Sequence, residues 1–265
     1  MKNLTLFVII ISVIASSCTV YQHIPTPQNL PALNEKNQFQ VNVNADFRKG
    51  SLQMNYAVSN AMLIFAEGFF YKSQNSGWFD KITSEDQDSY NGWIGEFKSG
   101  FGFYHREENT GFSLLLGGGT GAFEYEHSIL DNFSTTYNYK VNGRNFDIFV
   151  QPAISFQPVS YFELIISARY KHYVYYGINQ FHRNDESHLG ESYDYLFYRP
   201  FTHYNFIEPA FTMRVGSENV KFQLQLFRSF CFDKNPPMYK EVSLNYQLGT
   251  IFTFGGNPKA QPADL

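Results

Sequence analysis

Apolar and polar residues alternate along most of this chain. From residue 38 onward, roughly ten runs of strand length place apolar residues on one face and polar residues on the other. In the first run, Val41 and Val43 alternate with Asn42 and Asn44. The clearest runs are Phe39–Asp46, Phe162–Lys171, Ile207–Val215, Val220–Ser229 and Val242–Phe254. This period of two predicts an all-β protein made of half-buried strands.

The connections between these runs differ in length. The even-numbered connections are tight, at Ser59-Asn60, Arg106–Thr110, Gln157–Ser160 and Gly216–Asn219. The odd-numbered ones include long polar stretches at Ser73–Asn91, His127–Tyr139 and Asn179–Phe201, and a shorter one at Asp233–Lys240. Short turns at one end and long loops at the other are typical of outer-membrane β-barrels. We therefore predict an antiparallel up-and-down β-barrel of about ten strands, inserted in a membrane and spanning residues 38–254.

The N-terminus indicates export. Lys2 precedes an apolar core, Leu4–Ala15, that is too short to cross a bilayer as a helix, so residues 1–17 are expected to be a signal peptide. The small residues before Cys18 resemble a bacterial lipobox, in which the cysteine is diacylated, although Ala15 stands where a branched residue is usual. An ordinary cleavage site beside an incidental cysteine is the alternative. We expect a lipid anchor at Cys18.

The segments that flank the barrel lack periodicity. Residues 18–37 are rich in Pro, Gln and Asn, which predicts an extended tether between the lipid and the first strand. No acidic cluster follows Cys18, in contrast to surface-exported lipoproteins of Bacteroidota, so the sequence favours the periplasmic leaflet. The polar tail, residues 255–265, is expected to be disordered.

Composition narrows the choice of function. Aromatic residues make up 18% of the chain, which suits a barrel with aromatic girdles at the membrane interfaces. The net charge of −4 excludes the basic footprint of a nucleic-acid-binding protein. Cys18 and Cys231 are the only cysteines, so neither a disulfide framework nor a cysteine metal site is predicted. No cofactor is expected.

The polar faces of the strands carry charges of both signs. If these faces line the lumen, the charges must be paired or hydrated, because burial of an isolated charge is prohibitive. The predicted network consists of Glu96, Lys98, Asp147, Glu163, Arg169, Lys171, Glu208, Arg214 and Lys221. A barrel of about ten strands is also narrow. We therefore expect a plugged interior rather than an open pore.

Alternation alone does not say which face points inward. A soluble lipocalin-like barrel, carrying a small apolar ligand in the periplasm, would turn its apolar face inward. That alternative predicts that Leu164, Phe211, Phe222 and Leu224 surround a cavity. The small, uncharged residues of the polar faces and the unequal connections favour the membrane barrel.

Motifs that carry chemistry are few. Gly117–Gly121 lacks the lysine and the following helix of a phosphate loop, and Glu85–Asp88 lacks the spacing of a calcium loop. The remaining cluster lies in the 179–201 loop, where His182, Asp185 and His188, with Ser187, are candidates for a hydrolase at the barrel rim. Their spacing matches no strong metal-site class, so no metal is predicted. The same loop carries Tyr193, Tyr195 and Tyr198, which would suit a binding surface or a membrane interface.

The chain resembles a group of small outer-membrane β-barrel lipoproteins from Bacteroidota. The resemblance rests on Cys18, on the tether ending in Leu33–Asn37, on the strand Phe39–Val43 and on Leu52–Asn60. It covers most of the mature region and brings no activity and no catalytic residues. The resulting expectation is a non-enzymatic outer-membrane lipoprotein with a structural or binding role through its long extracellular loops. Its expected partners are outer-membrane lipid and an unidentified surface ligand or envelope protein.

Overall fold

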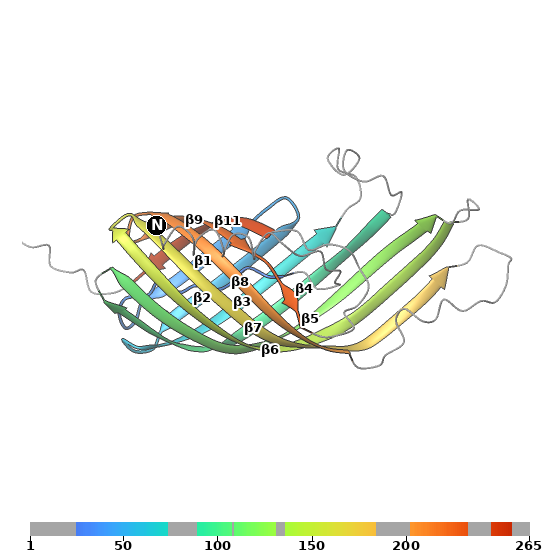
Figure 1. Cartoon of the computed structure of the whole chain (residues 1–265), viewed down its shortest axis with the longest axis horizontal. Helices are drawn as coiled ribbons and strands as arrows, with labels where there is room; N and C mark the ends of the chain where they lie inside the picture. Colours follow the sequence, from blue (N-terminus) through green and yellow to red (C-terminus); the bar gives the residue numbers. More distant parts are fainter. Residues whose placement is uncertain are drawn as a thin grey trace, which may run out of the picture.

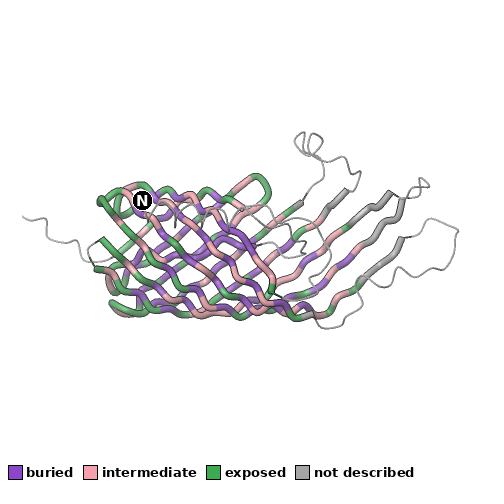
Figure 2. Tube along the Cα trace, viewed as in Figure 1, coloured by how far each residue is buried: buried purple, intermediate pink, exposed green. Residues whose placement is uncertain are grey.

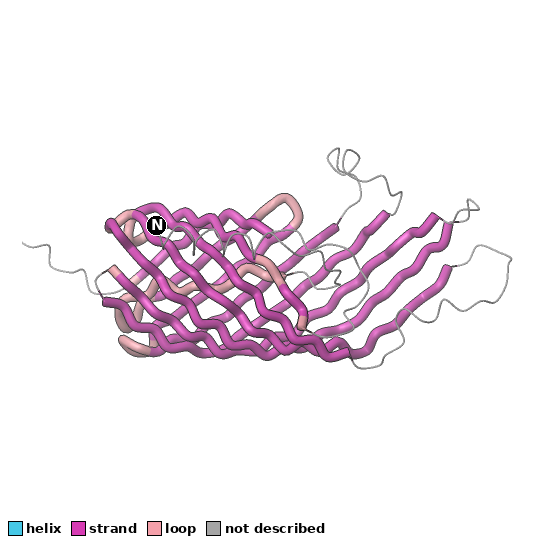
Figure 3. The backbone as a smooth tube through the Cα atoms, in the orientation of Figure 1, coloured by secondary structure: helices cyan, strands magenta, loops and turns pink. Residues whose placement is uncertain are grey.

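The computed structural model describes residues 25–73, 89–107, 109–130, 136–183, 202–232 and 245–255. These residues form strands, turns and extended segments, as the colouring of Figure 3 shows. Within them, no helix is long and apolar enough to cross a bilayer. The strands are β1 (Phe39–Ala45), β2 (Lys49–Ala57), β3 (Met62–Ser73), β4 (Ser89–Glu107), β5 (Thr110–Leu130), β6 (Thr136–Val159), β7 (Phe162–Arg183), β8 (Thr202–Gly216), β9 (Val220–Phe227), β10 (Phe230–Cys231) and β11 (Asn245–Phe254).

The strands close into a barrel (Figure 1). Neighbouring strands from β1 to β8 pair in sequence order, each antiparallel to the next. The first strand also pairs with the last, β11, which pairs with β9, and β9 completes the circle by pairing with β8. The short β10 adds two residues beside β8. The predicted barrel of about ten antiparallel strands is confirmed.

The outer face of the barrel is apolar and the inner face is polar, which is the reverse of a soluble protein. Along β9, Phe222 is 64% exposed, whereas its neighbour Gln223 is 4% exposed. Figure 2 shows this alternation of buried and exposed residues along the strands. Exposed apolar positions occur all round the wall, on strands from β1 to β11. Such a belt is stable only against lipid, so this is a membrane barrel of the outer-membrane type.

The orientation of the strands overturns the lipocalin-like alternative. Leu164, Phe211 and Leu224 are half-buried on the outer face, and Phe222 is exposed there. The positions that alternate with them are buried and polar or charged, among them Glu163 and Thr212. An apolar ligand inside the barrel would find no apolar wall at these positions.

The four strands β4 to β7 are much longer than a bilayer requires. They contain 19, 21, 24 and 22 residues, whereas about ten residues suffice to span the hydrocarbon region. Figure 1 shows these strands extending beyond β1, β2, β9 and β11 at the loop end. The predicted loop His127–Tyr139 was therefore too long, because strand pairing continues to Leu130 and resumes at Thr136. The start of the predicted 179–201 loop likewise belongs to β7.

The predicted tether needs a larger correction. Residues 25–33, which we call the lumen segment, are extended as expected, but they lie inside the barrel. Every residue of this segment is buried except Pro31, which is half-buried. The chain therefore passes through the interior before it forms β1. Residues 1–24 and 256–265, with the predicted signal peptide, Cys18 and most of the C-terminal tail, lie outside the described residues.

Candidate functional site

The lumen segment is held by hydrogen bonds to many strands. The side chain of Gln225 on β9 accepts from the backbone N–H of Gln28 at 2.7 Å and donates to its carbonyl at 3.2 Å. Asn29 and Asn55 on β2 exchange two amide hydrogen bonds of 2.8 and 3.0 Å. The amide of Gln151 on β6 donates to the Asn29 carbonyl. Barrel glutamines and asparagines thus replace the water that an extended backbone requires.

Among the residues of the lumen segment whose side-chain contacts are described, Thr26 lies farthest from the short turns. Lys98 on β4 donates to the Thr26 hydroxyl at 2.7 Å. Arg169 on β7 donates to the same hydroxyl at 2.9 Å and to the Thr26 carbonyl at 2.6 Å. One neutral residue therefore joins two buried cations that come from different strands of the wall.

Apolar contacts close the lumen nearer the short turns. Leu30 packs with Ala153 and Ile165. Leu33 is 3% exposed and belongs to a larger cluster of inward-facing side chains. The other members of that cluster are Ala57, Leu63, Phe65, Tyr104, Leu115 and Phe149. The interior is thus sealed by leucines at the turn end and by polar groups above them.

The charges of the lumen form two clusters. The upper cluster lies around Thr26, where Lys98 contacts Glu96 at 2.6 Å, and Arg169 contacts Glu208 at 2.7 Å. Its members are Glu67, Glu96, Lys98, Asp147, Arg169, Lys171 and Glu208. All of them are at most 6% exposed. Because water is largely excluded, each of these charges depends on its partners for stabilisation.

Glu163 is the centre of the lower cluster, close to the short turns. Its carboxylate is contacted by Arg106 at 3.1 Å, Lys221 at 3.2 Å and Arg214 at 3.5 Å. Arg214 also donates to the carbonyl of Leu30 at 2.5 Å. One carboxylate is therefore shared by three cations, and one of those cations, Arg214, also fixes the lumen segment.

Two glycines of β5 make room for the upper cluster. A Cβ atom on Gly119 would lie 2.5 Å from Cγ of Lys98, and one on Gly121 would lie 2.9 Å from Cγ of Glu96. Larger residues at these inward positions would displace the charged side chains. The glycine run thus serves close approach between neighbouring side chains, in accordance with its interpretation as strand rather than phosphate loop.

We expect Glu163→Gln to lower the free energy of unfolding by about 3 kcal/mol, because it leaves buried cations without an anion. Urea titration of the barrel folded in lipid vesicles measures this change. Glu107→Gln is the matched control, because Glu107 pairs with His105 at the exposed β4–β5 turn, and it is expected to have no measurable effect. Equal stability of the two variants would show that the lower cluster is not required for folding.

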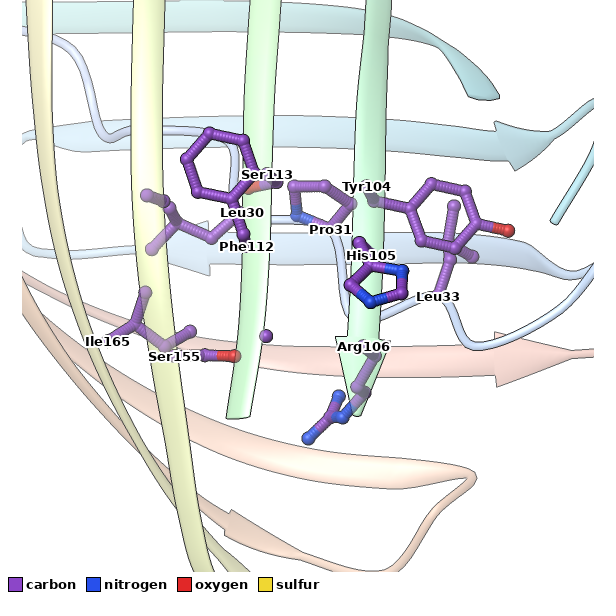
Figure 4. Close-up of a pocket in the computed structure, with 12 residues that line it drawn as sticks. Leu30, Pro31, Leu33, Tyr104, His105, Arg106, Phe112, Ser113, Ser155 and Ile165 are labelled. Carbon is purple, nitrogen blue, oxygen red and sulfur yellow. The ribbon is translucent and has the colours of Figure 1, made fainter. Parts of the chain in front are cut away.

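The cavity between the lumen segment and the wall is too small for a substrate. One cavity, of about 20 Å³, lies at the turn end between the lumen segment and the barrel wall, and it is large enough for about one water molecule. Leu30, Pro31, Tyr104 and Arg106 contribute to its lining (Figure 4). A small-molecule pocket is usually at least ten times larger.

The structure brings together all nine residues of the predicted charge network, and each of them is buried. Sequence analysis did not find Glu67, which adds the fifth acidic side chain of the two clusters, or Arg106 at the edge of the lower cluster. The lumen segment was also missed as part of the site.

The rim residues remain predictions. Asp185, Ser187, His188, Tyr193, Tyr195 and Tyr198 lie outside the described residues. For His182 the structure describes the backbone alone, which pairs with Tyr139 at the end of β7. Within the described residues, no group of three or more His, Cys, Asp or Glu side chains could hold a metal ion.

Comparison with solved structures finds distant similarities to outer-membrane barrels, of which three are described here. No protein-family model matches the chain, and no curated protein matches it. The outer membrane protease OmpT from Escherichia coli is 12% identical with a TM-score of 0.47, covering 83% of this chain and 94% of its own. A major outer membrane protein from Thermus thermophilus is 11% identical with a TM-score of 0.40, and the match covers 82% of this chain and 99% of that protein. An outer membrane channel from Pseudomonas putida is 8% identical with a TM-score of 0.39, and the match covers 86% of this chain and 100% of that protein. None of these similarities assigns an activity to this chain.

Proposed function

We propose that this protein is a sealed, lipid-anchored outer-membrane barrel without enzymatic activity, which serves the envelope through its outer loops as a structural or binding protein. The observation that carries the proposal is the lumen segment, which fills the barrel and bonds to its wall. A barrel built to conduct solutes would keep this space open.

The ionisable groups of the lumen support a structural role for the interior. Lys98, Arg169 and Glu208 have the chemistry of acids, bases or anion ligands, but they are buried against one another and against the lumen segment. A catalytic group must reach its substrate. Contact with an external partner is therefore assigned to the long connections at the loop end, and contact with lipid to the apolar outer face.

Conductance across a planar lipid bilayer tests the seal. The intact protein, purified as a folded barrel, is expected to produce no stable conductance steps. Folding is verified independently, because a closed barrel withstands a carbonate wash of the outer membrane and migrates faster on a gel when it is not boiled. Steps of fixed size from the intact, folded protein would overturn the sealed-barrel proposal.

A further inference from the structure

The lumen segment climbs the barrel from the short turns toward the loop end. Asn34 bonds to Gln38, just before β1 begins, and Ala32 bonds to Gln40, the second residue of β1. Leu30 bonds to Arg214, two positions before β8 ends at its short turn. As the chain is followed backward toward its N-terminus, its contacts therefore leave the turn end.

The contacts of earlier residues lie higher on the wall. Gln225, the partner of Gln28, is five positions from the turn end of β9. Lys98, the partner of Thr26, is nine positions from the turn end of β4. With a rise of about 3.3 Å per residue and the usual tilt of barrel strands, this places Thr26 roughly 20 Å above the short turns. Among the contacts of residues 26–34, the bond between Thr26 and Lys98 lies the most positions from the turn end of its strand.

The position of Thr26 can be compared with the apolar belt. On β4 the exposed apolar side chains extend from Phe103 near the turn to Trp93 near the loop end. Lys98 is midway between them, so Thr26 lies near the middle of the membrane, about 13 Å below the outer edge of the belt. Thr26 is eight positions after Cys18, and a chain of that length reaches about 26 Å when extended. Cys18 can therefore reach the outer edge of the belt with length to spare.

The way back toward the periplasm is occupied. Below Thr26, the lumen segment itself occupies the interior, where its Gln28, Leu30 and Leu33 are at most 3% exposed. Their neighbours are the inward side chains of the wall, including Phe65 and Phe149. A second pass of the chain through this level would require the leucine contacts to open.

The upper part of the lumen, by contrast, contains polar atoms that call for a partner. Both carboxylate oxygens of Glu67 and of Asp147 are buried and make no hydrogen bond within the described part of the chain. Oδ1 of Asn145 is likewise without a hydrogen bond there, whereas Nζ of Lys171 lies 3.3 Å from Oδ2 of Asp147 and forms an ion pair with it. Asp147 and Asn145 lie farther from the turn end of their strand than Lys98 does from that of β4. Buried polar groups are rarely left without partners, because each costs about 1–3 kcal/mol.

We propose that the chain before Pro25 continues upward past these groups and leaves the barrel at the loop end, so that Cys18 and its lipid lie on the outer side of the membrane. The backbone of that chain would then supply hydrogen-bond donors for the Glu67 carboxylate and the other buried acceptors of the upper lumen. The N-terminal chain would thus pass through the lumen of its own barrel to reach the cell surface. This inference rests on the proposed sealed, lipid-anchored barrel and deepens it.

This route replaces the expected periplasmic leaflet as the site of the anchor. The expectation rested on the lack of acidic residues after Cys18, a feature of lipoproteins that are exported to the surface. A segment enclosed by its own barrel needs no acidic export signal, because it crosses the outer membrane when the barrel is inserted.

Thiol labelling of intact cells tests the route. In a Cys231→Ser background that retains Cys18, a single new cysteine is introduced by Thr19→Cys, Phe47→Cys or Glu218→Cys. Phe47 is fully exposed in the β1–β2 turn at the loop end, and Glu218 is exposed in the β8–β9 turn at the other end. A membrane-impermeant maleimide is added to intact cells and, in parallel, to cells with a permeabilised outer membrane.

We expect Thr19→Cys to be labelled in intact cells to the same extent as Phe47→Cys, and Glu218→Cys to be labelled after permeabilisation only. If Thr19→Cys, like Glu218→Cys, were labelled after permeabilisation only, the N-terminus would lie in the periplasm and the inference would be overturned. The two turn variants report whether the barrel itself is inserted in the membrane. A barrel that is not inserted is therefore distinguished from an inserted barrel whose N-terminus lies in the periplasm. Faster migration of each unboiled variant verifies that it has folded, and the background protein without a new cysteine measures unspecific labelling.

Discussion

Deletion of residues 19–33 is expected to convert the sealed barrel into a conducting one. The deletion joins Cys18 to Asn34 at the turn end, so the lipid anchor is kept while the lumen segment is removed. Water then enters a passage lined by Gln40, Gln53, Lys98 and Arg169, all of which are buried in the intact protein. Planar-bilayer recordings should change from no steps to resolvable steps.

The same deletion should also destabilise the barrel. Arg169 and Arg214 lose backbone carbonyl partners, and the apolar side chains around Leu33 lose their packing partner. Hydrogen bonds and apolar burial together make a loss on the order of 5 kcal/mol in the free energy of unfolding reasonable. Deletion of residues 256–265 is the control for a shortened chain. A deletion variant without residues 19–33 that folds but stays silent would show that the wall side chains close the lumen unaided.

Arg169→Met is expected to be the most damaging single substitution in the lumen. The Arg169 side chain is fully buried, pairs with Glu208 at 2.7 Å and bonds twice to Thr26. Removal of one partner of a buried ion pair typically costs about 3–5 kcal/mol, because the other charge is left uncompensated. Urea titration in lipid vesicles, followed by the fraction of the fast-migrating unboiled form, measures the loss.

Two companion variants separate charge from side-chain loss. Arg169→Met combined with Glu208→Gln removes both charges and should regain part of the stability. Arg144→Met removes an arginine from an exposed position on β6 and should leave stability within about 0.5 kcal/mol of the natural protein. If Arg169→Met proved no worse than Arg144→Met, the upper cluster could not be holding the barrel together.

The barrel could be predicted from sequence because its wall obeys a simple rule. Lipid outside and a polar lumen inside impose a period of two, as in the first strand, which was predicted over Phe39–Asp46 and spans Phe39–Ala45 in the structure. The same rule identified Glu163, Arg169 and the other network residues, since charges on a polar face have nowhere to lie except the lumen.

Where this rule fails, the sequence is ambiguous for physical reasons. On β3 both faces are apolar, because Leu63 and Phe65 point inward against Leu33, so the inward position of Glu67 could not be read from alternation. Beyond the apolar belt the sequence no longer alternates regularly between apolar and polar residues, so the ends of β5 and β6 were taken for a loop.

The lumen segment was missed for a related reason. Its Pro, Gln and Asn residues have the composition of a solvated linker, because an extended backbone can be satisfied either by water or by the amides of a barrel wall. Nothing in the pattern of residues 25–33 distinguishes these two environments. The contacts that do so come from residues far away in sequence, such as Gln151 and Gln225.

The pairing of the first strand with the last has a consequence for biogenesis. The lumen segment leads directly into β1, and the wall becomes continuous when β11 docks on β1. The segment must therefore lie along the nascent sheet before that seam forms, because afterward no gap in the wall admits it. A peptide with the sequence of residues 25–37, supplied after assembly, would find the lumen enclosed. The order of synthesis, with the interior first and the closing strand last, thus matches the order in which this protein can be put together.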